Sequence, residues 1–178
     1  MKHLIKIFFV LFLGMAAVPG QAELQLQRAT LTVEDMDRSL AFYTDLLGFT
    51  VSGDARYDTP ALRTMFHIPE GVTPRLVLLD ASPAQPRALA LVHAEGLSVD
   101  AESNARHAPA LVINTTRLDE IMARATTAGV TVILPPTPLN DFSGKPFGRE
   151  AMILDPDGVR IVFFELLKSD VDKTASHD

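Results

Sequence analysis

The chain repeats one unit twice, and this weak internal repeat limits its fold more than any other feature of the sequence. In each copy an alternating apolar segment is followed by a segment with helical periodicity, a glycine and a second apolar segment. Gly48 of the first copy corresponds to Gly129 of the second at an offset of 81, and Met36 corresponds to Leu118 at an offset of 82. Self-similarity at a regular spacing predicts two copies of one supersecondary unit.

The first copy predicts a strand at 24–33, a helix at 34–47 and a strand at 49–51. The apolar residues of the middle segment have the spacing of an amphipathic helix. Asp35 is a suitable N-cap for this helix, and Gly48 follows its last turn. The second copy predicts the same order, with a strand at 108–115, a helix at 116–128 and a strand at 130–134.

Each copy then predicts a hairpin. The strands are expected at 75–79 and 88–92 in the first copy, and at 151–154 and 159–167 in the second. In the second hairpin the connection is Asp155-Pro-Asp-Gly158, and proline at the second position with glycine at the fourth favours a type I turn.

The segments between these strands differ in the two copies. Thr59 and Pro60 have the residue types of an N-cap and a first helical position, so they predict a short helix at 61–67. The matching segment of the second copy, 135–148, is rich in proline and glycine and is expected to be a loop.

Each copy is therefore expected to form a β-α-β-β-β module of one α+β domain at 23–168. Module one would occupy about 24–96 and module two about 106–167. Two such modules would form a curved mixed sheet, and alternate strand residues would line a shared cavity. The last residues, 169–178, are polar and are expected to form a tail.

The N-terminus has the pattern of a secretory signal peptide. Its first six residues carry lysines, residues 7–18 are apolar, and Gly20 and Ala22 are small residues before a cleavage site after Ala22. The apolar run is shorter than the roughly 20 residues that span a bilayer. Removing residues 1–22, with their two lysines and no acid, leaves 156 of 178 residues and changes the formal net charge from −6 to −8. The expected location is the periplasm or the exterior.

The composition excludes several classes of function. A chain this acidic, without a run of Lys or Arg, lacks the electrostatic signature of a nucleic-acid-binding protein. The absence of cysteine excludes disulfides, thiolate zinc sites and cysteine nucleophiles. The expected partner is a small-molecule ligand, without nucleic acid and without a membrane once the signal peptide is cleaved. Both a monomer and a homodimer are compatible with these data.

Two motifs carry a resemblance to a known family. The first runs from Leu31 to Phe49 and contains Arg38-Ser39-Leu40-Ala41-Phe42-Tyr43, and the second is the Asp155-Pro-Asp-Gly158 turn. With the repeat, they resemble the vicinal oxygen chelate (VOC) superfamily, which includes glyoxalase I, bleomycin-resistance proteins, methylmalonyl-CoA epimerase and extradiol dioxygenases. The resemblance covers residues 24–167 and implies the glyoxalase/bleomycin-resistance fold.

The resemblance also implies a divalent metal, such as Zn, Ni, Mn or Fe, held by histidine or glutamate on the first and last strands of each module. The positions that match these ligands are Arg28, Ala90, Ala110 and Val162. None of these side chains can bind a cation, and arginine would repel one. We therefore expect no metal and no other cofactor.

Side chains on the same strand faces as these four positions are expected to contact a ligand. Arg28 could bind a carboxylate or phosphate through two hydrogen bonds, or could instead pair with an acidic residue or extend from the rim. The expected ligand-binding residues are Arg28, Thr30, Ala90, Ala110, Val112, Asn114, Val162 and Phe164. This lining suits a small, partly apolar molecule, and we expect the chain to bind one. If Arg28 contacts the ligand, the ligand is expected to be an anion.

Two alternatives remain open. His93, His107 and Glu165 each lie three residues from a family ligand position, which places them on the opposite strand face unless a bulge intervenes. Together with His67 they could hold a relocated metal in a lyase, isomerase or dioxygenase of the glyoxalase type. The second alternative is a structural subunit without catalysis.

Residues in the two dissimilar segments could close over a cavity, since long connections often form lids. They could equally pack within or solvate a loop. These residues are Arg56, Tyr57, His67, Phe142, Lys145 and Phe147.

Overall fold

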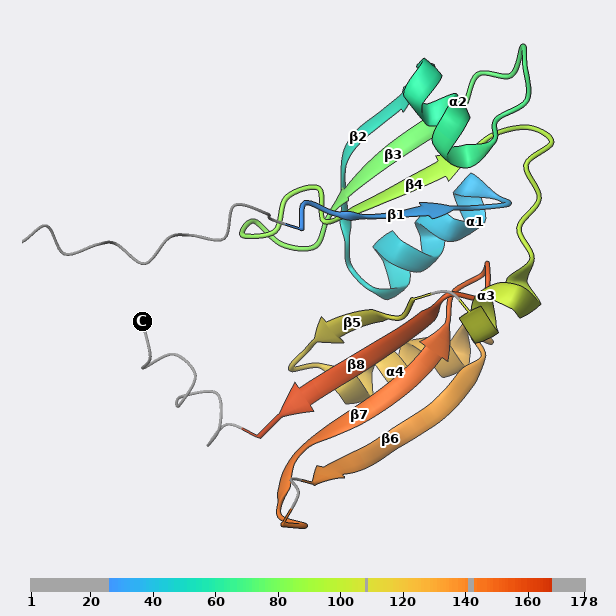
Figure 1. Cartoon of the computed structure of the whole chain (residues 1–178). Helices are drawn as coiled ribbons and strands as arrows, with labels where there is room; N and C mark the ends of the chain where they lie inside the picture. The colour runs from blue at the N-terminus through green and yellow to red at the C-terminus, as the bar shows by residue number, and fades with distance from the viewer. Residues whose placement is uncertain (1–25, 108, 141–142, 168–178) are drawn as a thin grey trace, which may run out of the picture.

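The computed structural model describes residues 26–107, 109–140 and 143–167. The signal peptide, the polar tail and Phe142 lie outside these residues. The first module contains β1 (Ala29–Thr32), α1 (Met36–Ala41), the π-helical turn η1 (Phe42–Leu46), β2 (Thr50–Arg56), α2 (Pro60–Phe66), β3 (Arg75–Asp80) and β4 (Leu89–His93). Helix α3 (Ala101–His107) follows, and the second module contains β5 (Leu111–Asn114), α4 (Leu118–Thr127), β6 (Val132–Asn140), β7 (Pro146–Leu154) and β8 (Arg160–Leu166). Figure 1 shows the first module above the second, with α3 in the connection.

The expected α+β architecture of two modules is confirmed, with the eight strands divided between two sheets. The strand orders are β1-β4-β3-β2 and β5-β8-β7-β6, and β1 and β5 each run parallel to their one neighbour. The remaining pairs are antiparallel. Both β1 and β5 are therefore edge strands, and no pairing joins them in the described part of the chain. Within the described residues, none of the helices has the length and apolar content to cross a membrane.

The caps predicted from the sequence are present. Asp35 is the N-cap of α1, and its Oδ1 accepts hydrogen bonds of 3.0 Å from the backbone N–H groups of Asp37 and Arg38. The Thr59 hydroxyl accepts one of 3.2 Å from the Leu62 N–H, so α2 begins at Pro60. These side chains satisfy N–H groups that have no partner within the helix.

The prediction of a loop at 135–148 is wrong. Most of this segment belongs to β6 and β7, which form a long hairpin. The three prolines of β6 are compatible with a strand because β6 is at the sheet edge, where one side of the backbone needs no pairing. The register between β6 and β7 shifts where the prolines occur, between Leu134 and Thr137.

One apolar core extends through both modules. Alternate residues of β3 and β4 face it from the first module, among them Val77, Leu79 and Leu91, and Ile153 and Phe163 face it from the second. Helices α1 and α4 and the η1 turn also contribute to the same cluster. Because the cluster is continuous, the two modules bury their apolar faces together.

The two motifs that carry the family resemblance contact each other across the module boundary. Asp157, in the turn before β8, is 1% exposed. Its Oδ1 accepts hydrogen bonds from the Glu34 N–H at 3.1 Å and Arg38 Nη2 at 3.2 Å, and its Oδ2 accepts one from the Ser39 hydroxyl at 2.9 Å. The turn of the second module therefore holds the start of α1 in the first.

Asp155 makes a second contact between the modules. Its Oδ2 accepts a hydrogen bond of 2.7 Å from the Tyr43 hydroxyl, and its Oδ1 accepts bonds from the N–H groups of Asp157 and Val159. Burial raises the pKa of the Asp155 carboxyl above its usual value, although these hydrogen bonds oppose the shift. Burial also raises the pKa of Tyr43 well above its usual range.

Helix α3, which the sequence did not predict, packs against the same turn. The Asn104 side-chain amide donates a hydrogen bond of 2.9 Å to the Asp157 carbonyl. Gly158 has a φ of +83°, and a Cβ at this position would lie 2.1 Å from the Ala101 carbonyl oxygen. Glycine is needed here for its conformation and for the close approach of α3.

Candidate functional site

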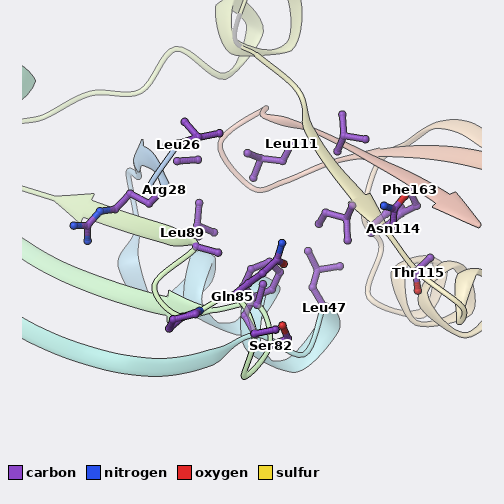
Figure 2. Close-up of a pocket in the computed structure, with 18 of the residues that line it drawn as sticks. Leu26, Arg28, Leu47, Ser82, Gln85, Leu89, Leu111, Asn114, Thr115 and Phe163 are labelled. Atoms are coloured by element: carbon purple, nitrogen blue, oxygen red, sulfur yellow. The ribbon is translucent and has the colours of Figure 1, made fainter. Parts of the chain in front are cut away.

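A groove of about 1210 Å³ lies between the two modules. The first module contributes the chain before and at β1, the end of η1 and the connection between β3 and β4. The second contributes β5, the start of α4 and Phe163 of β8. Figure 2 shows Leu26, Arg28 and Leu89 on one side and Leu111, Asn114, Thr115 and Phe163 on the other. The groove exists because β1 and β5 do not pair.

Most of the groove surface comes from apolar side chains. They are Leu26, Ala29, Leu47, Phe49, Ala81, Ala84, Pro86, Ala88, Leu89, Leu111, Val112, Ile113, Ile121 and Phe163. The polar side chains are Gln27, Ser82, Gln85, Asn114 and Thr115, and the charged ones are Arg28 and Arg117. An apolar concave surface with a few polar groups is typical of small-molecule sites.

The exposed edge of β5 explains why residues from both of its faces line the groove. Leu111 and Ile113 turn toward the core and are partly buried, whereas Val112 and Asn114 turn outward and are exposed. Val112 is 60% exposed, which is high for a large apolar residue in a strand. An exposed apolar side chain beside a groove is a typical contact for a ligand.

Three of the eight residues predicted to bind a ligand line this groove: Arg28, Val112 and Asn114. The other five do not. Thr30 pairs with Ala90 in the first sheet, and Val112 and Asn114 pair with Val162 and Phe164 in the second. The predicted set is thus divided between two sheets, and a ligand role for Thr30, Ala90, Ala110, Val162 and Phe164 stays a prediction.

The residues at the family's metal-ligand positions do not fit a metal ion. Arg28, Ala90, Ala110 and Val162 offer no lone pair to a cation. In the described part of the chain, no three His, Cys, Asp or Glu side chains come together in a way that could hold a metal.

The residues of the alternative metal set lie in separate environments. His93 Nδ1 is 3.1 Å from the Val33 carbonyl oxygen, and His107 is exposed at the end of α3. Glu165 accepts hydrogen bonds from the Leu118 N–H at 3.2 Å and from Arg149 Nε at 3.0 Å. Glu165 therefore stabilises the start of α4 and an ion pair.

The described residues of the predicted lid do not line the groove. Arg56 donates a hydrogen bond to the Thr73 carbonyl, and Tyr57 is exposed beyond the end of β2. His67 ends α2 with a φ of +51°. Lys145 and Phe147 lie at the start of β7, in the hairpin that replaces the expected loop.

Sequence reasoning missed Arg117 and the connection between β3 and β4. Arg117 is the N-cap residue of α4, and its Nη1 lies 3.7 Å from Glu120 Oε1. A Cβ placed on Gly48 would lie 3.7 Å from Arg117 Nη2, which shows that this side chain reaches the first module. The sequence contains no signal for this contact because it depends on how the modules pack.

A second cavity, of about 770 Å³, lies beside α1 and β4. It includes acidic residues, among them Glu34, Asp37 and Glu95, together with Arg75 and His93. Arg75 already pairs with Asp37 and Asp54, at 3.0 and 2.8 Å. The strongest cation of this cavity is therefore already held in ion pairs, and the groove between the modules is the better candidate site.

Comparisons with known proteins agree with the fold. The chain matches the family model of the Glyoxalase/Bleomycin resistance protein/Dioxygenase superfamily over residues 25–163. No curated protein matches it.

Similar solved structures include the trypanothione-dependent glyoxalase I of Leishmania major, which is 24% identical and has a TM-score of 0.54. The match covers 85% of this chain and 92% of that one, and the coverages below are given in the same order. A fosfomycin resistance protein of Listeria monocytogenes, solved with Mn(II) and a dihydroxypropylphosphonic acid, has 18% identity, coverage of 84% and 97%, and a TM-score of 0.53. An antibiotic binding protein from a Streptomyces species has 23% identity, coverage of 83% and 100%, and a TM-score of 0.50. These similarities support the fold, and with the family match over most of its length the chain belongs to the glyoxalase/bleomycin resistance protein/dioxygenase superfamily.

Proposed function

We propose that this protein binds a small, partly apolar organic molecule in the groove between its modules, without a metal ion. The observation that carries the proposal is the groove itself, a space of about 1210 Å³ lined by apolar, polar and two charged side chains. The side chains at the family's four metal-ligand positions support the metal-free state, since none can coordinate a cation. Binding of a small molecule has a parallel in the similar Streptomyces structure, which is an antibiotic binding protein.

Binding can be tested with N-phenyl-1-naphthylamine, a neutral apolar molecule whose fluorescence increases when it leaves water. Protein treated with EDTA is expected to bind it saturably, at about one equivalent. The substitution Val112→Trp fills the groove from an exposed position, so the core is not disturbed. We expect it to weaken binding by about tenfold or more, which corresponds to the loss of roughly 1.4 kcal/mol of contact.

Ile133→Trp is the matched control. Ile133 is 53% exposed on β6 and does not line the groove, so the same substitution there should leave binding unchanged. Absence of saturable binding, or equal affinity in the wild type and Val112→Trp, would contradict the proposal.

Metal content tests the second part of the proposal. Elemental analysis of protein purified without chelators is expected to find Zn, Ni, Mn and Fe at well below one equivalent. About one equivalent of any of them would mean that other residues provide ligands, and would favour the enzyme alternative.

We also propose that the protein is exported after cleavage behind Ala22, because residues 1–22 combine a basic start, an apolar run and small residues before the cleavage site. N-terminal sequencing of the protein from the periplasm of a bacterial host is expected to begin at Glu23. A chain that keeps Met1 and stays in the cytoplasm would contradict this part.

A further inference from the structure

We propose that the groove selects organic anions, and that Arg28 and Arg117, one from each module, provide this selectivity. The inference rests on the proposed function and narrows its ligand to one chemical class: an apolar body that carries a carboxylate, phosphonate or similar oxyanion. Three observations on the charges of the groove lead to it.

The first observation is the sign of the charge. The charged side chains among the described residues that line the groove are both arginines, and no Asp or Glu is among them. The whole chain has the opposite balance, with 22 acidic and 16 basic residues and a formal net charge of −6. The groove is thus a locally positive surface on an acidic protein, which attracts anions and repels cations.

The second observation is that neither arginine donates a hydrogen bond to a carboxylate of the described residues. Arg28 donates a long hydrogen bond of 3.5 Å to the amide oxygen of its neighbour Gln27. Arg117 Nη1 is 3.7 Å from Glu120 Oε1, which is an ion-pair distance but not a hydrogen bond. Each guanidinium carries five N–H donors, so most of these donors face solvent or a ligand.

Two arginines outside the groove, Arg75 and Arg149, are held more firmly. Arg75 donates hydrogen bonds of 2.8 to 3.0 Å to Asp54 and Asp37. Arg149 is held by Asp119 and Glu165 in the same way. These arginines have structural roles, whereas the two in the groove retain the donors that a bidentate oxyanion contact needs.

The third observation is where the two arginines lie. Arg28 precedes β1, and Figure 2 shows its guanidinium at the side of the groove away from Leu47 and Phe163. Arg117 precedes α4 and reaches Gly48 of the first module. Apolar side chains such as Leu89 cover the surface between the modules. A ligand with an apolar body and a charged group can therefore contact leucine and phenylalanine side chains and an arginine together.

Two fluorescent probes of almost the same shape test this inference. 1-Anilinonaphthalene-8-sulfonate is N-phenyl-1-naphthylamine with one added sulfonate, so the difference in their affinities reports the contribution of the anion. We expect the wild type to bind the sulfonate about tenfold more tightly, the lower end of what a hydrogen bond to a charged group contributes. The double substitution Arg28→Ala/Arg117→Ala should remove this preference, so that the ratio of the two affinities falls to about one. The single substitutions show which arginine contacts the anion.

Arg106→Ala is the charge-matched control, because Arg106 is exposed on α3, pairs with Glu102 and does not line the groove. It should leave both affinities unchanged. Decanoate should displace the sulfonate probe, whereas inorganic phosphate at the same concentration should not, since it lacks an apolar body.

The outcomes separate this inference from the proposed function. Groove binding of the neutral probe without any preference for the sulfonate would overturn the anion selectivity and leave the proposed function intact. A preference that persists in the double variant would also overturn it. If the wild type binds neither probe, the proposed function itself is contradicted.

Discussion

Five polar residues of the two family motifs act at the module boundary, whereas Leu47 and Phe49 of the first motif line the groove. Asp157 accepts hydrogen bonds from Ser39 and Arg38, and Asp155 accepts one from Tyr43. None of these five side chains lines the groove. The motifs therefore identify the fold because they hold its two halves together, and they carry little information about the ligand.

The buried Asp155 carboxyl leads to a prediction about pH. Its pKa is raised in the folded state, so between the ordinary value of 3.8 and the raised value the folded protein binds more protons than the unfolded chain. The contribution of this group to the free energy of unfolding therefore falls as pH rises through that range. Asn cannot titrate, so the Asp155→Asn variant lacks this pH dependence. Its free energy of unfolding, measured by urea denaturation, should rise relative to that of the wild type as pH increases from 3 to 8.

Asp119→Asn is a control of opposite sign. The hydrogen bonds from Arg149 lower the pKa of Asp119, so its contribution is present above the ordinary pKa and is lost in acid. This variant should lose stability relative to the wild type as pH rises. If the free energies of unfolding of Asp155→Asn and the wild type differ by the same amount across the pH range, burial does not shift the pKa of the Asp155 carboxyl.

The sequence predicted individual site residues only in part. Arg28 was identified because it occupies a position where the family has histidine, and it lines the groove. Arg117 was missed because its approach to Gly48 depends on how the modules pack. Local pattern cannot show such a contact, because the two residues are far apart in the chain.

At the scale of elements, the strongest local signals were correct. The helix caps at Asp35 and Thr59 and the turn at Gly158 are where the sequence predicted them. The errors fall where tertiary contacts override local propensity. Three prolines made the segment of β6 look like a loop, but a strand at the sheet edge tolerates them. Helix α3 packs against Gly158, which is distant in the sequence.

The packing of α3 on the turn predicts a large effect for Gly158→Ala. The positive φ should cost about 1–2 kcal/mol, and the clash with the Ala101 carbonyl should add about 1–3 kcal/mol as overpacking. Gly71→Ala is the matched control, since Gly71 has a φ of +80° and no atom within 4 Å of an added Cβ. Gly71→Ala should lower the free energy of unfolding only by the contribution of the positive φ. Equal losses in the free energy of unfolding for the two variants would contradict the close contact.

At the scale of the whole molecule, the repeat correctly predicted two modules of the same strand and helix order. It could not predict that β1 and β5 remain unpaired edges, because one repeat unit contains no information on how two units meet. The groove arises from this relation, so its position was beyond sequence reasoning. The alternation of side chains did predict that Val112 and Asn114 share one face of their strand, and both line the groove.

The continuous core predicts that the two modules unfold together. Leu91 lies on the central strand β4 of the first sheet and Ile161 on the central strand β8 of the second, and both belong to one cluster. Native-state hydrogen exchange should give their amides the same free energy of opening, within about 1 kcal/mol. A value several kcal/mol lower for one module would show that the modules are independent.

The central claim is that the groove between the modules binds a small organic anion without metal. The most direct test is the amide chemical-shift map of EDTA-treated protein during titration with 1-anilinonaphthalene-8-sulfonate. The account predicts shifts at groove residues of both modules, including Ala29, Leu89 and Asn114, and the same map after zinc is added. Shifts confined to another surface, or shifts that appear only when a metal is present, would contradict it.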